Sequence, residues 1–413
     1  MNQNRYDVVI VGGGPAGLTA ARVLGEAGAT VLVIEKDRQI AERVRTSGGT
    51  WIRDMAEHRV PESMCHPFRR IRLVTPGSET TFEHAHARAC VLDVRRVYQH
   101  LAARSARAGA LVRTGTAVQA VTTENDRPSG VTVRRGDGRN ELIRADIVVD
   151  ASGYAARPSR GFGVPIARRT YGVGFEEEME APGYDQEEAV FLLGRQFAPG
   201  GYAWAFPCGQ GRVRVGVGVP LPSSGPGPAE LARRLRSSSA HLRSALTGAR
   251  TVEVHRGIVP FSPPSAPLVW NGLVRVGDAA GHASALAGEG IRLAMDAGSM
   301  AGRAIADALN DSGPASARLP AYERGWRRTR ARELRAAWRL HRGLLQREDD
   351  EWERLGRALR PLSADQLDRL FRSRYSAPWL LGVIVRSPRT VPLGLRLLRP
   401  RRLPRDPSRS VAG

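Results

Sequence analysis

Three glycines near the N-terminus are spaced for binding a phosphate group. Gly12, Gly14 and Gly17 follow the apolar run 7–11 and precede a helical pattern that closes at Gly28. In such a strand–turn–helix unit, the glycines permit a tight turn, close approach of the backbone to a pyrophosphate, and close helix–strand packing. The N–H groups at the start of the helix then face the phosphates. The spacing therefore predicts a dinucleotide-binding unit.

A second apolar run and an acidic residue complete this unit. Residues 31–34 read Val-Leu-Val-Ile, and Glu35 follows them at the position where a carboxylate accepts ribose hydroxyls. The expected cofactor contacts of this half of the site are Gly12, Gly14, Pro15, Ala16, Gly17, Glu35, Lys36, Arg43 and Gly48.

A second glycine-rich segment lies more than 200 residues further along the chain. A short apolar strand leads into Gly277-Asp278, and Gly288-Glu289-Gly290-Ile291 then opens a helical pattern that reaches Met300. A helix N-terminus aimed at a reduced flavin would stabilise its negative charge. The alternative is a strand-to-helix turn in which Asp278 is an N-cap.

Together, the two segments resemble the FAD signatures of the flavoprotein class that includes the aromatic hydroxylases and geranylgeranyl reductases. The resemblance implies a glutathione-reductase-type fold with non-covalent FAD, in which Asp278 holds the ribityl chain and Gly277, Gly288, Gly290 and Ile291 lie toward the flavin. Residues 145–153 resemble a third shared segment of that class. One departure is Ala285, where the family usually has proline.

Between these segments the pattern changes to one strand after another. Strands are expected at 171–175, 189–193, 202–206 and 213–219, the last with four valines on one face. The expected fold class is α/β: a Rossmann-like FAD domain, an inserted antiparallel-sheet substrate domain, and a C-terminal helical region.

Within that sheet, residues 199–207 resemble the P-x-x-Y-x-W-x-F-P signature of the geranylgeranyl reductase family. Tyr202, Trp204 and Phe206 alternate and therefore share one face; with Pro207 they are expected to line an apolar substrate cavity. The alternative is that these aromatic side chains are ordinary core. Cys208 stands where the family usually has lysine.

The catalytic candidates are Ser47, Tyr202, Trp204 and Glu289. Ser47 stands in a Ser-Gly-Gly segment where archaeal relatives carry Cys-Gly-Gly, so a proton donor at that cysteine would be missing here. The other three are candidates by position, and packing or helix capping would explain them equally well. The three scattered cysteines predict neither a disulfide framework nor a metal site.

The charge and the ends of the chain bear on partners and location. The formal net charge of +21 favours anionic partners, but no nucleic-acid-binding motif is present, and no nucleic-acid partner is expected. With no signal peptide or 20-residue apolar span, we expect a cytoplasmic protein. The arginine-rich tail leaves two interpretations open: a helical cap, or a basic amphipathic surface docking on the inner face of an anionic membrane.

The expected domains are FAD-binding residues 1–165 and 250–305, substrate-domain residues 166–249 with 60–100 as a further candidate, a helical cap at 306–400, and a disordered tail at 401–413. The expected activity is reduction of C=C bonds in a prenyl or other apolar substrate, by hydride from flavin N5, with NAD(P)H or a reduced protein as transient electron donor. The alternative is an FAD monooxygenase acting on a small aromatic or polyene compound. A flavin halogenase is disfavoured because that chemistry uses a lysine to hold the halogenating species. The only lysine, Lys36, directly follows the ribose-binding Glu35, at the far end of the cofactor.

Overall fold

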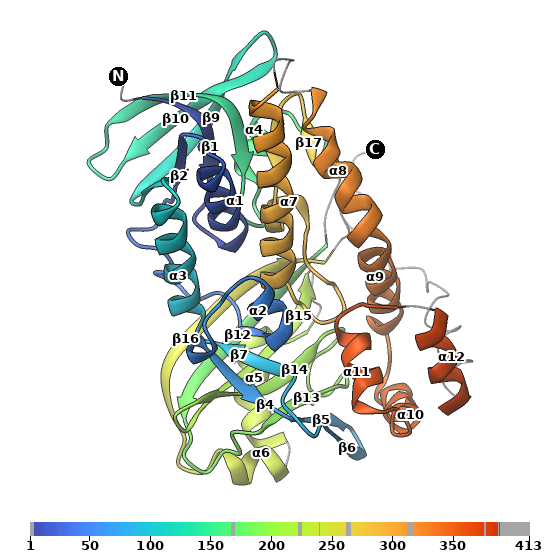
Figure 1. Ribbon diagram of the computed structural model, residues 1–413. Coiled ribbons are helices and arrows are strands. Elements are labelled where there is room, and N and C mark those ends of the chain that lie inside the picture. The colour runs from blue at the N-terminus through green and yellow to red at the C-terminus, as the bar shows by residue number, and fades with distance from the viewer. Residues whose placement is uncertain are drawn as a thin grey trace, which may run out of the picture.

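The molecule has two sheet-based domains joined along one side by C-terminal helices, as the computed structural model in Figure 1 shows. The structure describes residues 4–166, 170–221, 225–238, 240–261, 266–311, 317–375, 377–386 and 388. In the described residues, no helix is both long and apolar enough to cross a membrane.

The first domain is built on a largely parallel sheet. Its strand order is β17-β18-β11-β1-β2-β8, with the β9–β10 hairpin attached to β11. The strands are β1 (Arg5–Val11), β2 (Val31–Ile34), β8 (Leu111–Arg113), β9 (Thr116–Glu124), β10 (Arg127–Arg135), β11 (Asn140–Asp150), β17 (Val269–Trp270) and β18 (Leu273–Arg275). Residues Val8–Val11 of β1 and Val31–Ile34 of β2 are buried, which explains their unbroken apolar runs. The expected Rossmann-like α/β domain is confirmed.

Helices cover this sheet. The main ones are α1 (Pro15–Glu26), α3 (Val94–Arg107) and α7 (Ile291–Leu309), which lie side by side on one face (Figure 1). Shorter helices of this half are α2 (Ile52–Glu57), η1 (Glu62–Met64), α4 (Arg157–Gly161) and η2 (Gly277–Ala280). A small sheet, β3-β7-β4, connects this domain to the next; its strands are β3 (Gly49–Trp51), β4 (Cys65–Phe68) and β7 (Ala89–Leu92).

The second domain is a seven-stranded sheet with the order β16-β12-β15-β14-β13-β5-β6. Its strands are β5 (Arg70–Thr75), β6 (Ser78–Glu83), β12 (Tyr171–Glu180), β13 (Glu188–Leu192), β14 (Tyr202–Gly209), β15 (Arg212–Leu221) and β16 (Arg250–Pro260). All neighbours are antiparallel except β13 and β5. Helices α5 (Pro228–Ser238) and α6 (Ala240–Ala245) cover one face.

The strand assignment differs from the expected domain boundaries in one place. Residues 250–260 were expected in the FAD-binding part, but they form β16, which pairs along its length with β12. Strands β5 and β6, from the segment 60–100, extend the opposite edge of the same sheet. Long-range pairing that the local pattern does not encode decides both assignments.

The C-terminal helices descend one side of the molecule from the first domain to the second (Figure 1). They are α8 (Pro320–Trp326), η4 (Arg327–Ala331), α9 (Arg332–Leu344), α10 (Asp349–Leu359), α11 (Ala364–Phe371) and α12 (Ala377–Arg386). Leu334 and His341 of α9 are buried. The tail predicted at 401–413 lies outside the described residues.

A buried ionic network ties these helices to the first domain. The Asp54 carboxylate on α2 accepts from Arg372 at 2.5 Å and from Arg374 at 3.4 Å, just beyond the end of α11. It also lies 3.9 Å from the Arg292 guanidinium on α7. Burial raises the pKa of the Asp54 carboxyl despite these three positive neighbours.

Asp54→Asn should therefore destabilise the protein strongly. It leaves buried guanidinium groups without their carboxylate, a loss of about 3–5 kcal/mol in the free energy of unfolding. Denaturant titration measures it. The control is Glu57→Gln on the same helix, which breaks an exposed pair with Arg53 and should cost less than about 1 kcal/mol. Equal effects of the two variants would contradict a structural role for the network.

Candidate active site

The first glycine motif forms a cradle at the start of α1. Gly12 has a φ of +113°, and a Cβ there would lie 2.3 Å from the carbonyl oxygen of Ala151. A Cβ on Gly17 would lie 2.2 Å from the Gly12 carbonyl oxygen. Gly14, in contrast, has no protein atom within 4 Å of an added Cβ. The turn is thus closed on the protein side and open on the side where a phosphate would bind.

Glu35 lies beside this cradle at the end of β2. Its carboxylate accepts from the backbone N–H of Gly13 at 2.8 Å and of Asp37 at 2.9 Å. These bonds fix the acid against the glycine turn, as a ribose-binding carboxylate requires. Lys36 and Arg43, expected as further contacts, have exposed side chains.

The second glycine motif is held against the first by the crossing of α1 and α7. A Cβ on Gly298 would lie 2.3 Å from the carbonyl oxygen of Ala16, so the helix backbones are nearly in contact. Gly277 adds a further close approach, with its added Cβ 3.0 Å from that of Ala16. Asp278 lies 3.7 Å from an added Cβ on Gly290, so both halves of the second motif meet.

Two connected cavities begin at the N-terminus of α7. The smaller has an empty volume of about 730 Å³ and is lined by residues 288–291, 46–47 and 49–51 and by Phe206. The larger, of about 1310 Å³ with its open mouth included, runs between the second sheet and helices α9–α11. Ser47, Tyr202 and Phe371 line both, so the two spaces meet beside the Gly288–Ile291 turn.

The floor of the larger cavity is a sheet face that carries glycine at several positions. A Cβ on Gly216 would lie 2.4 Å from the Trp204 ring, and one on Gly218 would lie 3.4 Å away. The indole therefore lies flat on β15. Gly172 and Gly174 continue this surface on β12 and also line the cavity. The glycines make room for aromatic rings: Trp204 lies over Gly216, and a Cβ on Gly172 would lie 2.1 Å from the Phe261 ring.

Two of the predicted catalytic residues have their donor groups engaged. The Tyr202 hydroxyl donates to the Ala287 carbonyl at 2.6 Å, and burial raises the pKa of Tyr202. The Trp204 indole N–H donates to Glu176 at 2.6 Å. Both rings line the large cavity, and the Tyr202 bond holds the loop before α7 in place.

The other two predicted catalytic residues lie at the junction of the cavities. Both Glu289 carboxylate oxygens accept from Arg292, at 2.7 and 2.8 Å, inside the protein. Ser47 lines both spaces, and its carbonyl oxygen accepts from Arg214 at 2.8 Å. Pro207, expected in the cavity, is buried and lies outside the residues that line it.

Sequence reasoning missed several cavity residues. Glu176 and His255 lie across from each other on β12 and β16, and His341 comes from α9. Burial lowers the pKa of His341 to about 4, so its ring is neutral near pH 7 and adds to the apolar lining. Burial also raises the pKa of Cys208 to about 12, so its thiol carries no charge at that pH. The signal in the sequence that could have found Glu176 and His255 is that each is a polar residue that interrupts a strand-like pattern.

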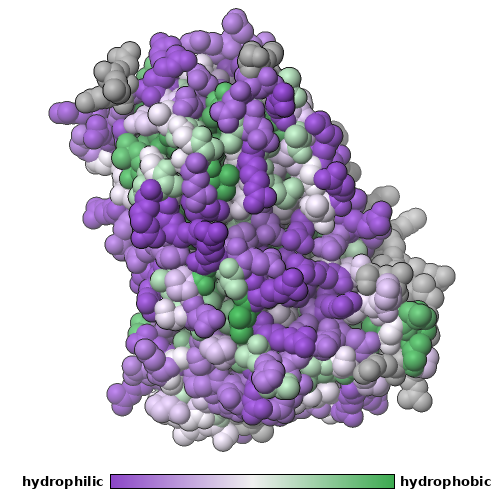
Figure 2. All heavy atoms as spheres, viewed as in Figure 1, coloured by the Kyte–Doolittle hydropathy of each residue, from purple (hydrophilic) through white to green (hydrophobic). Residues whose placement is uncertain are grey.

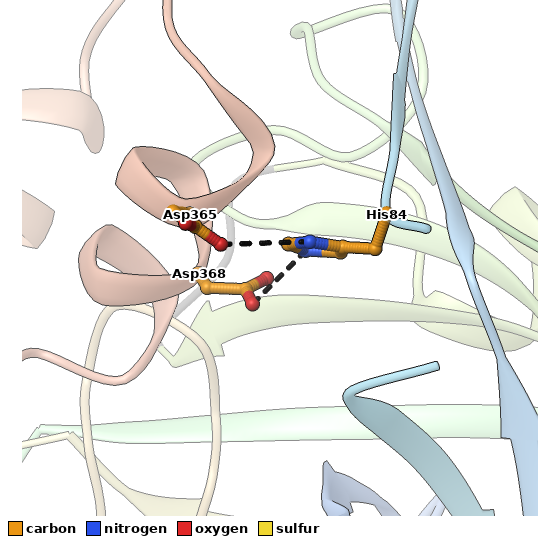
Figure 3. A group of neighbouring side chains, drawn as sticks. All are labelled: His84, Asp365 and Asp368. Carbon is orange, nitrogen blue, oxygen red and sulfur yellow. Dashed lines mark ion pairs between the residues drawn. The ribbon is translucent and has the colours of Figure 1, made fainter. Parts of the chain in front are cut away.

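One cluster of potential metal ligands lies outside the cavities. Within the described residues, His84, Asp365 and Asp368 place ligand atoms within 4.8 Å of one another. Figure 3 shows that the two ring nitrogens of His84 face different carboxylates, at 3.6 and 3.0 Å. Arg88 pairs with Asp365 at 2.5 Å as well. We interpret this arrangement as a set of ion pairs that holds α11 beside the end of β6.

Comparisons with known proteins agree with this geometry. A family model described as lycopene cyclase protein matches residues 7–397. A digeranylgeranylglycerophospholipid reductase of Methanothermobacter thermautotrophicus is 31% identical over 92% of this chain and 99% of its own. The solved structure of a geranylgeranyl bacteriochlorophyll reductase-like protein from Thermoplasma acidophilum is 26% identical, with a TM-score of 0.83 over 95% of this chain and 99% of that chain.

The chain belongs to the lycopene cyclase protein family by its family model and to the geranylgeranyl reductases by its relatives. It is an FAD-dependent oxidoreductase, as the resemblance in its motifs implied. A flavin-dependent brominase, 18% identical over 95% of this chain and 93% of its own, shares the fold with a TM-score of 0.68.

The residues present fit FAD. The cradle at Gly12–Gly17 is open where the pyrophosphate would lie, and Glu35 is fixed where it would receive the ribose. The smaller cavity at the start of α7 offers space for the flavin beside a helix N-terminus. With a rise of 1.5 Å per residue, the seven residues from Ile291 to Gly298 place that N-terminus about 10 Å along α7 from the crossing at Ala16.

Gly14→Val should abolish FAD binding without unfolding the protein. An added side chain meets no protein atom here, so the fold should persist, but it would fill the space that the phosphates need. We expect at least a 100-fold weaker FAD affinity by flavin-fluorescence titration, with unchanged circular dichroism. Gly161→Val, at a second glycine with open space around it, should bind FAD normally. Retention of FAD by Gly14→Val would refute the cradle.

Proposed function

We propose that this protein reduces isolated C=C bonds in the prenyl chains of a lipid. The observation that carries the proposal is the large apolar cavity, which starts beside Ser47 and Tyr202 at the Gly288–Ile291 turn. Prenyl chains carry no polar groups, so a cavity lined by aromatic and aliphatic side chains suits them. FAD, when bound, supplies the hydride.

The chain's own residues position the alkene and exclude water. Trp204 forms a flat surface on the glycine face of β15, and Phe191, Tyr202 and Phe371 surround the junction, with Phe191 and Phe371 stacked at 4.8 Å. Helices α10 and α11 contribute Leu355, Leu359, Leu367 and Leu370. Holding a flexible chain in one place beside the flavin end of the site lowers the entropic part of the barrier.

For the electron donor we propose NAD(P)H or a reduced protein that binds transiently. The sequence holds one G-x-G-x-x-G unit, at 12–17, and that unit fits FAD. A nicotinamide would therefore bind without a dinucleotide fold of its own.

A reaction with a geranylgeranyl lipid tests the proposed function. The FAD-loaded protein is reduced without oxygen, mixed with the lipid, and the product is weighed by mass spectrometry. We expect a gain of about two mass units for each bond reduced. An unchanged lipid, together with oxygen insertion into an aromatic or polyene compound when air is admitted, would replace this proposal by a monooxygenase.

We also propose that helix α12 docks on an anionic membrane surface. Leu381, Ile384 and Val385 are 62%, 44% and 73% exposed and occupy one face at helical spacing. Figure 2 shows a hydrophobic patch over this helix, one of several on the face in view. The net charge of +21 attracts anionic head groups.

The position of α12 connects this surface with the cavity. The Trp379 indole N–H donates to the Gln366 carbonyl at 3.1 Å, so α12 packs on α11. Other residues of α11, Leu367 and Phe371, line the large cavity. A membrane in contact with α12 would thus bring lipid chains close to the helices that cover the substrate.

Replacing Leu381 and Val385 by serine should weaken membrane binding about tenfold. The loss of two partly inserted apolar side chains accounts for this size, since full burial of each contributes about 1.5–3 kcal/mol. Co-sedimentation with phosphatidylcholine–phosphatidylglycerol vesicles measures it. The matched control replaces Val252 and Val254, which are exposed on β16, and should bind as the unmodified protein does. Equal binding by both double variants would exclude α12 as the docking surface.

A further inference from the structure

Two titratable side chains interrupt the apolar wall of the large cavity. Glu176 and His255 both line it, and each is only 3% exposed. They stand opposite each other in the pairing of β12 with β16, on the sheet face that carries Trp204. A buried carboxylate and imidazole are costly beside hydrocarbon, so this position calls for a role.

The two side chains form a hydrogen-bonded couple. One Glu176 oxygen lies 2.8 Å from Nδ1 of His255, and the other accepts from the Trp204 indole at 2.6 Å. The carboxyl group is therefore oriented on both sides. It rests on the same glycine surface where a ligand would lie, since Gly216 pairs with Glu176 on one side and with Trp204 on the other.

The couple also has a route to solvent. Nε2 of His255 lies 3.5 Å from a carboxylate oxygen of Glu253, whose side chain is about two-fifths exposed and which accepts from Arg95 at 2.8 Å. An imidazole with a carboxylate near each nitrogen can take up a proton on one side and release it on the other. The order Glu253, His255, Glu176 thus leads from the surface to the cavity.

The other charged groups around the couple are already paired. On the same face of β12, Glu178 accepts from Arg214 at 2.9 Å. Arg45, in the loop before β3, lines the cavity and pairs with Asp37 at 3.3 Å. Glu178 and Arg45 each have an oppositely charged partner of their own, so neither is assigned as the proton donor.

The remaining protic groups of the cavity are poor candidates for protonating carbon. The Tyr202 proton is engaged with Ala287, and the Glu289 carboxylate is held by Arg292. The Ser47 and Thr46 hydroxyls are very weak acids, and the His341 ring is neutral near pH 7 because burial lowers its pKa to about 4. Among the described lining residues, this leaves the couple as the proton source.

We infer that Glu176, assisted by His255, is the acid that protonates the alkene; this rests on the proposed function. The O–H bond of protonated Glu176 breaks, and its proton forms a C–H bond with one alkene carbon through the π-electron pair. FAD, when bound and reduced, would supply the hydride for the C–H bond at the other carbon, so the alkene would gain the two electrons that the flavin loses. Glu176 then regains its proton through His255.

The surroundings suit an unactivated alkene. No carbonyl conjugated with an isolated C=C bond accepts the negative charge, so positive charge develops on carbon as the proton arrives. The faces of Trp204 and Tyr202 stabilise a cation that forms over them, and the low dielectric strengthens this effect.

Single-turnover kinetics of Glu176→Gln test the inference. The variant, loaded with FAD and reduced by dithionite without oxygen, is mixed with a geranylgeranyl lipid in D₂O. We expect flavin oxidation by the alkene to slow at least 100-fold, with normal FAD content. Residual product should be a mixture of two stereoisomers, deuterated on one face or the other of the protonated carbon, because water then replaces a fixed acid. Glu176→Asp, which keeps a carboxylic acid, should recover single-face deuteration.

The matched control is Glu177→Gln, on the same strand but the opposite face, where Glu177 pairs with Arg236 at 2.7 Å. It should oxidise flavin at the unmodified rate. His255→Gln should slow the second and later turnovers more than the first, because recharging of Glu176 is impaired. If Glu176→Gln oxidises flavin within threefold of the control, with single-face deuteration, the acid assignment is overturned and the reductase proposal stands. If the unmodified protein leaves the lipid unreduced, the proposed function itself fails.

Discussion

The crossing of α1 and α7 is the contact on which the site depends. Gly298 lets the two backbones approach so closely that a single added carbon would lie 2.3 Å from the Ala16 carbonyl oxygen. Gly302 repeats the approach one turn later, with an added Cβ 2.8 Å from Val23. Because α1 begins at the phosphate cradle and α7 begins at the cavities, this contact fixes the distance between the two ends of the FAD site. A larger residue at position 298 would separate them.

The large cavity, which begins near the start of α7, exists because the second sheet carries glycines in place of larger side chains. Its face carries glycine on neighbouring strands where most sheets would carry side chains, and the Trp204 ring occupies part of the space gained. The remaining volume is closed by apolar side chains of α10 and α11. Few polar side chains line this wall, and the buried Glu176 carboxyl is tolerated there because each of its oxygens has a hydrogen-bond partner.

Local patterns predicted the parts of the site that are local. The turn from Gly12 to Gly17, the acid at Glu35 and the alternation of Tyr202 and Trp204 depend on residues within one or two elements. The strand β16 was misplaced, and Glu176 and His255 were missed, because their meaning comes from pairing between strands some 80 residues apart. The hydrogen-bond partners of Tyr202 and Glu289 could not be predicted either, because tertiary packing decides that Tyr202 meets the Ala287 carbonyl and Glu289 meets the Arg292 guanidinium.

The buried ionic network completes the link between cofactor and substrate. Glu289 and Arg292 form a bidentate pair at the start of α7, beside the smaller cavity. Through Asp54, the same cluster reaches Arg372, the residue after Phe371, which lines both cavities. Charges in such surroundings are poorly screened, so a displacement of α11 would be felt at the start of α7. The cover of the large cavity and the start of α7 are therefore connected by one set of charges.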